Sequence, residues 1–325
     1  MLPDLSIIIV NWNTKEYLLS CLDSIVRCLS AFSKEVIVVD NASSDGSCDT
    51  VKTNYAEVSL VASTVNNGFA WGVNEGIRRS QGKYILILNP DIVLQPEAIE
   101  KLISFFESHA DAGALMPMLM NADGVFQKGY VRKIPTLFQV IFFHTFFEPW
   151  SRKIQWLVER FLEAPLQDEE YSEVEQIPGA CILVRRSVIV AVGLMDEEYK
   201  LFFEDVDWSL RMRRAGWKLV LYRKAALTHV GGRSFVSKNN EWVFERFTLS
   251  LILFFKKNRS KLSAFFVELV LVCNSGIIYL IRSITVAGNN AFESAAYSKR
   301  KHKLFLKSFY TMFVRHRGVP LHAGR

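Results

Sequence analysis

The chain has 325 residues, of which 50% are hydrophobic and 22% are charged, so it can bury a large core and is not a disordered chain. Its net charge of +6 is unevenly distributed, because residues 256–325 carry 13 basic and 2 acidic residues (+11), which leaves 26 minus 31, or −5, for residues 1–255. An acidic body argues against a nucleic-acid partner, and a basic, apolar tail favours an anionic membrane surface. A protein partner for the tail, or a solvated helical face, is the alternative.

Two features of the sequence bear on the compartment in which the protein is expected. The cysteines show no CxxC spacing and no dense framework, which favours reduced thiols; they are Cys21, Cys28, Cys48, Cys181 and Cys273. The first residues lead directly into an apolar run, without the three regions of a signal peptide. We therefore do not expect a secreted protein.

The first half of the chain alternates apolar runs typical of buried strands with segments of helical spacing. Strands are expected at residues 6–10, 35–39, 58–61 and 83–88, and helices at residues 15–29, 72–79 and 96–106. Because the β-branched runs are too apolar for half-exposed strands, the pattern predicts a mostly parallel, Rossmann-like central sheet with helices on both faces. The predicted fold class is α/β.

Polar loops follow four successive strands of this predicted sheet, where ligands of parallel sheets bind. They cover residues 11–13, 40–47, 66–70 and 89–91. Each loop alone is compatible with an ordinary turn, but four in succession predict a binding edge. The chain has neither a Gly-x-Gly-x-x-Gly after its first strand nor a P-loop, so a bound phosphate needs another positive charge. A divalent cation is the obvious candidate, and the hard oxygen ligands of Asp91 suit Mg²⁺ or Mn²⁺.

Five segments, taken in order, resemble the motifs of family 2 glycosyltransferases, and most closely those of bacterial rhamnosyltransferase-like members. These segments are residues 39–47, 67–69, 89–91, 178–180 and 204–208. The resemblance covers residues 5–235 and implies a GT-A fold with inverting transfer from a nucleoside diphosphate sugar. It predicts a catalytic domain at residues 1–235, with an aromatic-rich insertion at about 135–165, and a basic, apolar helical tail at residues 236–325.

Donor nucleotide or sugar binding is expected at Asn11, Asp40, Asn67, Asn89 and Asp91. Asp40 matches the family carboxylate that accepts a hydrogen bond from the pyrimidine ring, a task that suits an acceptor-only group. A helix cap or turn aspartate is the alternative for Asp40. Asn89 stands first in the family's Asp-x-Asp motif and brings no negative charge, so we expect it to bond the ribose or sugar and Asp91 to hold the metal.

The segment of residues 228–234 resembles the histidine segment that completes the metal site in some relatives. It implies that His229 is a second ligand of Mg²⁺ or Mn²⁺, with the donor's phosphates and water in the remaining positions. A structural histidine is the alternative, and loss of metal dependence stays open. Arg233, beside two glycines, is interpreted either as a cation on a closing loop or as part of a surface turn.

Three acids of the segment at residues 204–207 provide candidates for the base that deprotonates the acceptor hydroxyl. Mutual repulsion in a partly buried site would raise the pKa of at least one of them. Asp205 matches the family's catalytic base. Glu204 and Asp207 are expected to orient the acceptor or to pair with a following arginine (Arg211, Arg213 or Arg214), and an acidic helix start is the alternative for the whole segment.

The acceptor site is also expected to include small residues and an aromatic ring. Gly179 and Ala180 resemble the family segment that floors the sugar and acceptor site, where small side chains permit close approach. Trp208 is interpreted either as a ring that stacks on a sugar or as a buried tryptophan. These residues complete the predicted site.

Two segments bear on membrane association. The aromatic-rich insertion suits a lipid interface, a clamp for a lipid-linked acceptor, or an ordinary core helix. Residues 262–281 have the length of a membrane span, but they contain Glu268 and Asn274 and carry basic flanks on both sides. We expect an in-plane, monotopic helix on the cytoplasmic leaflet, with a span or a soluble core or dimer helix as alternatives.

The leading interpretation is a peripheral membrane glycosyltransferase on the cytoplasmic face of the inner membrane. It would move a sugar, L-rhamnose from dTDP-rhamnose or another sugar from a dTDP or UDP donor, to a lipid-linked saccharide in cell-surface polysaccharide assembly of the O-antigen or cell-wall type. Another nucleotide-sugar enzyme or a nucleotidyltransferase is the first alternative, but the first loop offers only Lys15 for a triphosphate. A non-catalytic carbohydrate-binding subunit would tolerate loss of the acids that this chain retains.

Overall fold

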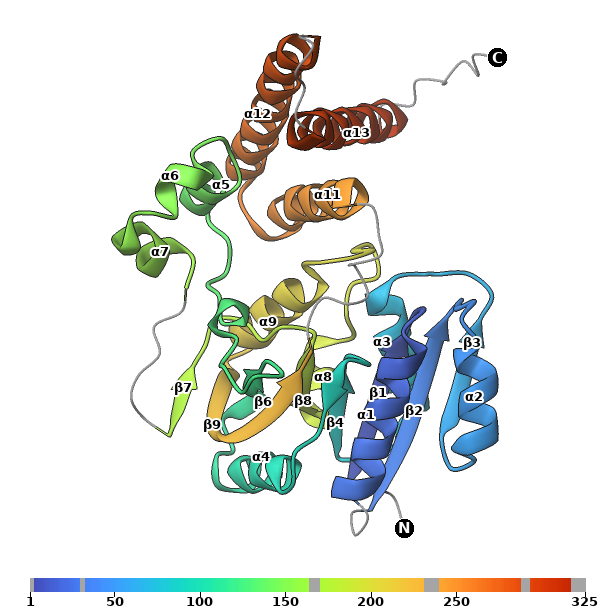
Figure 1. Ribbon diagram of the computed structural model, residues 1–325. Coiled ribbons are helices and arrows are strands. Elements are labelled where there is room, and N and C mark those ends of the chain that lie inside the picture. The colour runs from blue at the N-terminus through green and yellow to red at the C-terminus, as the bar shows by residue number, and fades with distance from the viewer. Residues whose placement is uncertain (1–2, 30–32, 164–169, 231–239, 288–292, 317–325) are drawn as a thin grey trace. The chain divides into compact units, whose positions relative to one another are not determined.

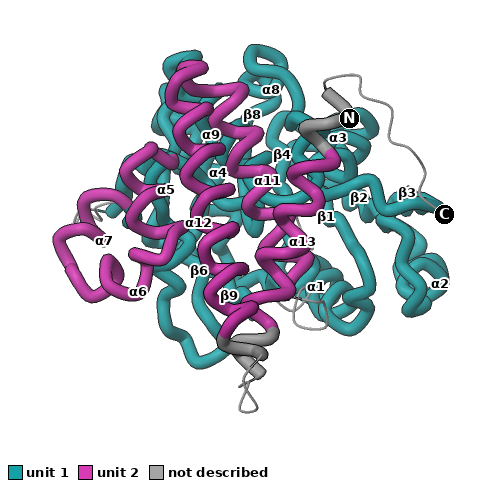
Figure 2. Tube along the Cα trace, turned by 90° about the horizontal axis from the view of Figure 1, so that it is seen from above, with its two compact units in different colours: residues 1–134, 162–234 teal, residues 135–161, 235–325 magenta. Residues whose placement is uncertain are grey.

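The computed structural model describes residues 3–29, 33–163, 170–230, 240–287 and 293–316. The chain forms two compact units (Figure 2): unit 1 is Met1–Ile134 with Leu162–Ser234, and unit 2 is Pro135–Phe161 with Phe235–Arg325. The sequence places the aromatic-rich insertion inside the catalytic domain, whereas the structure groups residues 135–161 with the C-terminal tail. The chain therefore leaves unit 1 and returns to it.

Unit 1 begins with the predicted alternation of strands and helices (Figure 1). Its first half contains β1 (Leu5–Asn11), α1 (Lys15–Cys28), β2 (Lys34–Asn41), α2 (Ser47–Asn54), β3 (Ser59–Ser63), α3 (Phe69–Arg79), β4 (Tyr84–Leu88), β5 (Ile92–Val93), α4 (Ala98–Ser108), β6 (Ala112–Met120) and η1 (Lys128–Tyr130). After the excursion into unit 2 come β7 (Tyr171–Glu173), β8 (Cys181–Arg185), α8 (Arg186–Val192), α9 (Glu204–Arg214) and β9 (Lys218–His229).

The strands of unit 1 form one mixed sheet in the order β3-β2-β1-β4-β8-β6-β9-β5, with β7 paired to β9. The pairs of β1 with β2, β1 with β4, and β2 with β3 are parallel, as predicted. However, β8 runs antiparallel between β4 and β6, and β5 and β7 run antiparallel to β9. Because β6 pairs parallel with β9, the described strands β1, β2, β3, β4, β6 and β9 share one direction, and β5, β7 and β8 run against it. The expectation of a mostly parallel sheet is therefore confirmed, with three antiparallel strands that the sequence did not predict.

Helices cover both faces of the sheet because side chains alternate along each strand. In β1, Ile7 and Ile9 enter the core shared with α1 and α4, whereas Ile8 and Val10 enter the core shared with α3 and α9. The second core is tightly packed, since a Cβ at Gly72 of α3 would lie 2.6 Å from a methyl carbon of Val10. Because both faces of the sheet are covered, successive residues of a strand are all buried, and its sequence is a continuous apolar run.

Unit 2 is helical. It contains α5 (Leu137–Phe143), α6 (Glu148–Ser151), α7 (Gln155–Phe161), α11 (Asn240–Asn258), α12 (Lys261–Ala287) and α13 (Glu293–His316). Within the described residues, one helix is long and apolar enough to cross a membrane: Lys261–Ile284 contains an 18-residue window with a mean hydropathy of 2.1, of which 28% is buried. Taken alone, one such helix is weak support for membrane association.

An exposed apolar stripe runs along α12. The buried face of the helix includes Ala264, Val267 and Leu271. Exposed side chains repeat at intervals of three or four residues on the other face: Leu262, Phe266, Leu269, Cys273, Ile277, Leu280 and Ile284. Because these intervals place side chains on the same side of a helix, α12 is apolar on its outer face as well as on its packed face.

Candidate active site

The carboxyl ends of β1 and β2 meet at one edge of the sheet, where the predicted donor residues lie. Asn11 and Asp40 are opposite each other in the parallel register. Asn11 is fully buried, and its Nδ2 donates to Asp40 Oδ2 at 2.8 Å and to Ser43 Oγ at 3.1 Å. The Oδ1 of Asn11 accepts from Thr14 Oγ1 at 2.7 Å. The side chain of Asn11 thus holds Asp40 in place, and a direct contact of Asn11 with the donor stays a prediction.

Asp40 is 1% exposed and is also held by its own loop, since the Ser43 backbone N–H donates to its Oδ1 at 2.8 Å. Ala42, in the same loop, has a φ of 67°, which a non-glycine residue seldom adopts. Strained backbone of this kind is found where the surrounding structure demands a particular geometry. The loop therefore presents the carboxylate of Asp40 in a defined orientation at the edge of the sheet.

The loop before α3 is fixed by the residue that follows Asp40. Asn41 Oδ1 accepts from the Asn67 backbone N–H at 2.9 Å, and Asn41 Nδ2 donates to the carbonyl of Gly68 at 3.0 Å. Gly68 has a φ of +98°, and a Cβ there would lie 2.6 Å from the carbonyl oxygen of Lys200. Glycine is required at this position both by its backbone conformation and by the close approach. The partly buried Asn67 is thereby held beside the end of β2.

Asp91 and His229 face each other, although they are far apart in sequence. His229 ends β9, which pairs antiparallel with β5 through Ile92 and His229. The distance from His229 Nε2 to Asp91 Oδ1 is 3.4 Å, and both side chains are almost completely buried. Neither of these two atoms has a hydrogen-bond partner among the described residues.

Two buried and unpartnered polar atoms fit a cation site, because each would otherwise carry an uncompensated desolvation cost. Carboxylate oxygen and imidazole nitrogen both bind Mn²⁺ or Mg²⁺, and their separation suits two adjacent ligands of one octahedral ion. Within the described residues, no cluster of three or more His, Cys, Asp or Glu side chains could hold a metal. A cation here would therefore need ligands from a substrate or water in addition to Asp91 and His229.

The segment before β8 connects the metal-site candidate to the predicted base. The backbone N–H of Asn89 donates to the carbonyl of Ala180 at 2.9 Å, and the backbone N–H of Gly179 donates to Asp205 Oδ2 at 2.8 Å. A Cβ at Gly179 would lie 3.0 Å from the ring of Phe69, so a larger side chain would crowd this junction. Two hydrogen bonds and one intervening peptide thus join the segment of Asp91 to Asp205.

Glu204 and Asp205 begin α9 with different surroundings. Glu204 is 5% exposed and its Oε2 has no partner among the described residues, whereas Asp205 is only half-buried. Burial, with the charge of Asp205 as a second cause, holds the pKa of Glu204 well above its usual range. Burial also raises the pKa of Asp205, opposed by hydrogen bonds from the N–H groups of Gly179 and Val206. The two backbone N–H groups that donate to Asp205 favour the ionised form of that carboxyl, whereas Oε2 of Glu204 has no partner among the described residues.

Two residues predicted for the acceptor site, Asp207 and Trp208, form hydrogen bonds with other parts of the protein. Asp207 is 4% exposed and its Oδ2 accepts from Arg211 Nε at 2.8 Å, which is the arginine pairing that the sequence left as an alternative. Trp208 is fully buried, and its Nε1 donates to the carbonyl of Gly193 at 2.9 Å. We therefore correct the expectation that Trp208 contacts the acceptor, because its ring packs in the core and its polar group is already satisfied.

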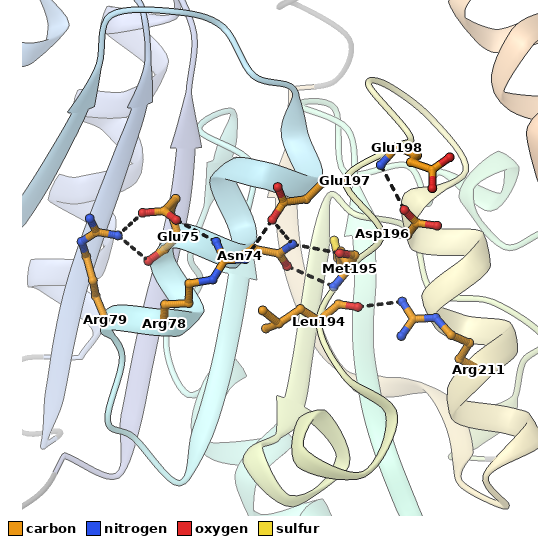
Figure 3. Close-up of polar contacts among 10 residues, drawn as sticks. All are labelled: Asn74, Glu75, Arg78, Arg79, Leu194, Met195, Asp196, Glu197, Glu198 and Arg211. Atoms are coloured by element: carbon orange, nitrogen blue, oxygen red, sulfur yellow. Dashed lines mark hydrogen bonds and ion pairs between the residues drawn. The ribbon is translucent and has the colours of Figure 1, made fainter. Parts of the chain in front are cut away.

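The segment that leads to α9 is tied to α3 by residues for which the sequence offered no motif (Figure 3). Asn74 Nδ2 donates to the carbonyl of Met195 at 2.8 Å and to Glu197 Oε1 at 2.8 Å, and Asn74 Oδ1 accepts from the Met195 N–H at 3.0 Å. Arg211 donates to the carbonyl of Leu194 at 2.8 Å. The sequence signal for this connection is weak: Asn74 is a polar residue within α3, the helix that follows the predicted loop at residues 66–70.

Backbone strain marks the entry to α9. Phe202 and Phe203 have φ values of 65° and 69°, and they directly precede the two acids Glu204 and Asp205. Consecutive left-handed phenylalanines are unfavourable and persist only where neighbouring contacts impose them. The predicted role of Arg233 lies outside the described residues, as do its neighbours Gly231 and Gly232.

A family model for glycosyl transferase family 2 matches residues 6–193, more than half of the chain. The chain therefore belongs to glycosyl transferase family 2. It is 29% identical over 205 residues to an N-acetylglucosaminyl-diphospho-decaprenol L-rhamnosyltransferase of Mycobacterium tuberculosis, with 60% of this chain and 66% of the relative covered. It is 27% identical over 249 residues to the rhamnosyltransferase WbbL of Escherichia coli (strain K12), with 73% and 88% covered.

Solved structures share the fold at low sequence identity. The mannosyltransferase PcManGT from Pyrobaculum calidifontis, in complex with GDP-Man and Mn²⁺, superposes with a TM-score of 0.54 at 13% identity over 98% of this chain and 85% of that chain. GalNAc-T7 with UDP, GalNAc and Mn²⁺ gives a TM-score of 0.57 at 12% identity over 98% and 59%. The mixed α/β sheet with helices on both faces fits a GT-A fold.

Proposed function

We propose that this protein transfers a sugar from a nucleoside diphosphate donor to an acceptor hydroxyl, with inversion at the anomeric carbon. The observation that carries the proposal is the chain of hydrogen bonds from Asn89 through Ala180 and Gly179 to Asp205, which connects the segments of the proposed cation ligand and the proposed base. Membership of glycosyl transferase family 2 supports this assignment.

On the donor side, the buried carboxylate of Asp40 accepts an N–H of the nucleobase, and the loop of Asn67 lies beside it. Asn89 bonds the ribose or sugar, and Asp91 with His229 holds Mg²⁺ or Mn²⁺ against the diphosphate. When bound there, the cation supplies positive charge that offsets the negative charge of the departing diphosphate. Another nucleotide-sugar enzyme or a nucleotidyltransferase is the alternative, for which the first loop offers only Lys15 as a cation toward a triphosphate.

On the acceptor side, Asp205 accepts the proton of the attacking hydroxyl as that oxygen bonds to the anomeric carbon. The bond from the anomeric carbon to the diphosphate oxygen breaks, and its electron pair leaves with the diphosphate. Glu204, whose pKa is raised by burial, orients the acceptor or pairs with its hydroxyl groups. Gly179 and Ala180 leave space beside Asp205 for the acceptor.

We further propose that the donor is dTDP-rhamnose, with another dTDP- or UDP-sugar as the alternative, and that the acceptor is a lipid-linked saccharide of cell-surface polysaccharide assembly. The names of both rhamnosyltransferase relatives, one of them acting on a diphospho-decaprenol, support the donor and acceptor class.

Unit 2 is proposed to hold the protein on the anionic, cytoplasmic face of the inner membrane as a peripheral or monotopic element. The exposed stripe of α12 supports this proposal, as do Trp150 and Trp156, which are 57% and 64% exposed in the segment of α6 and α7. Exposed aromatic and aliphatic side chains on helices flanked by basic residues suit the interface of a bilayer.

A screen of nucleotide sugars tests the proposal. The full-length protein would be incubated with dTDP-rhamnose, UDP-sugars and GDP-mannose, with a membrane extract as acceptor, and release of nucleoside diphosphate would be measured with and without EDTA. We expect release from dTDP-rhamnose that needs the extract and stops with EDTA. Release from no sugar donor would overturn the proposed activity, and release unaffected by EDTA would overturn the role of the cation.

A further inference from the structure

We propose that Gln127 is a positioning residue of the cation site: its side-chain amide fixes the ring of His229 so that Nε2 presents a lone pair to the cation opposite Asp91. The inference rests on the proposed function in that it assigns a cation to the pair of Asp91 and His229. It adds a residue that belongs to none of the motifs of the sequence.

Gln127 and His229 exchange two hydrogen bonds. Gln127 Nε2 donates to the backbone carbonyl of His229 at 2.9 Å, and Gln127 Oε1 lies 2.7 Å from His229 Nδ1. Because a carbonyl oxygen can only accept, the first bond determines which end of the amide is nitrogen. The second bond then requires that Nδ1 of His229 carries the hydrogen. In the neutral ring, Nε2 therefore has no hydrogen.

This tautomer explains the unpartnered atoms on the other side of the ring. Nε2 of His229 points to Oδ1 of Asp91 at 3.4 Å, and both atoms are acceptors without a partner among the described residues. Two buried acceptors that face each other repel unless a cation or a proton lies between them. A metal ligand whose second ring nitrogen donates to a fixed oxygen is the common arrangement of histidine in metal sites.

A tight turn places Gln127 beside the end of β9. The chain turns back after β6 because Asn121 Oδ1 accepts the N–H groups of Asp123 and Val125, and Gly124 provides a φ of +76°. The backbone N–H of Gln127 then donates to the carbonyl of Leu119 at 2.8 Å, alongside β6.

The pairing of β6 with β9 brings this turn to the histidine. Met120 of β6 is opposite Thr228 of β9, the residue before His229. The ring of Tyr130, three residues after Gln127, packs edge-on against the His229 ring at 5.0 Å between centroids. The orientation of the imidazole is thus set by two residues of one short segment.

Binding of Mn²⁺ tests the inference with matched variants. Free Mn²⁺ would be measured by electron paramagnetic resonance during titration of the full-length protein with MnCl₂ in the presence of UDP. In Gln127→Met the acceptor on Nδ1 is lost, and we expect a 10- to 100-fold weaker affinity, about the range known for such outer partners of metal ligands. Gln127→Glu keeps an acceptor on Nδ1 and should bind Mn²⁺ at least as tightly as the wild type.

Gln95→Met is the matched control. Gln95 Nε2 donates to Thr228 Oγ1 at 3.1 Å, so this variant removes the same kind of side chain from the neighbouring residue of β9. It should leave the Mn²⁺ affinity unchanged. Wild-type affinity in Gln127→Met, or an equal loss in Gln127→Glu, would overturn the role of Gln127.

A second measurement needs no bound metal. Nitrogen NMR of ¹⁵N-histidine-labelled protein reports the tautomer of each of the six histidines, and His229→Asn identifies the signal of His229. We expect the Nδ1–H tautomer in the wild type and in Gln95→Met, and a mixed or Nε2–H population in Gln127→Met. An Nε2–H tautomer in the wild type would refute the inference. If neither the wild type nor any variant binds Mn²⁺, the cation of the proposed function is refuted. The tautomer of His229 then still tests the role of Gln127.

Discussion

The two units of this protein differ in the kind of group that they offer to a contact from outside the chain. In unit 1, the buried Asp91 and His229 turn unpartnered polar atoms toward each other. In unit 2, exposed apolar side chains line one face of α12, with Ile284 at 77% and Leu262 at 66% exposure. Both arrangements are unfavourable unless something outside the chain contacts them. The comparison agrees with the two proposals made above, a cation bound by unit 1 and a membrane surface contacted by unit 2.

The difference extends to how the side chains are held. Around the site of unit 1, Asn11, Asn41 and Asn74 each make at least two hydrogen bonds to loops that follow strands or precede helices. The exposed face of α12 consists of side chains that need no defined partner. A polar ligand requires fixed geometry, whereas an apolar surface requires only area.

The largest effect is expected from the predicted base of unit 1. Asp205→Asn keeps the shape of the side chain and an acceptor for the Gly179 N–H, but it cannot take up the acceptor's proton. We expect sugar transfer to fall by about 10²- to 10⁴-fold, with donor binding unchanged by calorimetry. Asp49→Asn, an exposed acid at the first turn of α2, serves as the control. Full transfer by Asp205→Asn would remove this residue as the base.

Removal of the carboxylate of the cation site should have the next largest effect. In Asp91→Asn, one of the two facing acceptors loses its charge, so Mn²⁺ affinity should fall by about 10- to 100-fold in the same resonance titration. Thermal stability should change little or rise, because a buried group without a partner is replaced by a neutral one. Equal affinity for Mn²⁺ in the wild type and in Asp91→Asn would show that the cation does not bind here.

A smaller effect is expected when the apolar stripe of unit 2 is broken. Ile284→Glu introduces a charge on the exposed face of α12 and should weaken co-sedimentation with phosphatidylglycerol vesicles by roughly 10-fold. Val190→Glu is the matched control, since Val190 of α8 in unit 1 is 82% exposed. If the two variants lose vesicle binding equally, the charge rather than the stripe is responsible and the contrast between the units disappears.

The smallest effect concerns stability and pH. The pKa of Glu204 is raised in the folded state above its unfolded value of about 4.3, so the stability that its protonated form contributes is present below pH 4 and is lost as the pH rises toward the folded pKa. Glu204→Gln removes this loss and should melt higher at pH 7, by about 2–4 °C for each kcal/mol, but not at pH 4. The exposed Glu57→Gln is the control. A lower melting temperature at pH 7 would contradict the prediction.

Much of unit 1 could be predicted from the sequence, because each apolar strand and the polar loop that follows it are formed by consecutive residues. The predicted strands at residues 6–10, 35–39 and 83–88 correspond to β1, β2 and β4. β6 and β9 had no place in the prediction, although they pair closely with each other. The antiparallel insertion of β8 between β4 and β6 could not be predicted either, because its pairing depends on residues more than 60 positions away and not on its own apolar pattern.

The sequence by itself determined the family, the order of the polar loops and the acids at the start of α9, since these depend on residues adjacent in the chain. Only the tertiary structure decided that Trp208 is buried, that Asp207 pairs with Arg211 and that residues 135–161 join the tail. It also brought Gln127 to His229, 102 positions away, through one turn and the register of two strands. These hydrogen bonds and packing contacts join residues that are distant in sequence. They depend on how the whole chain folds and not on any one segment.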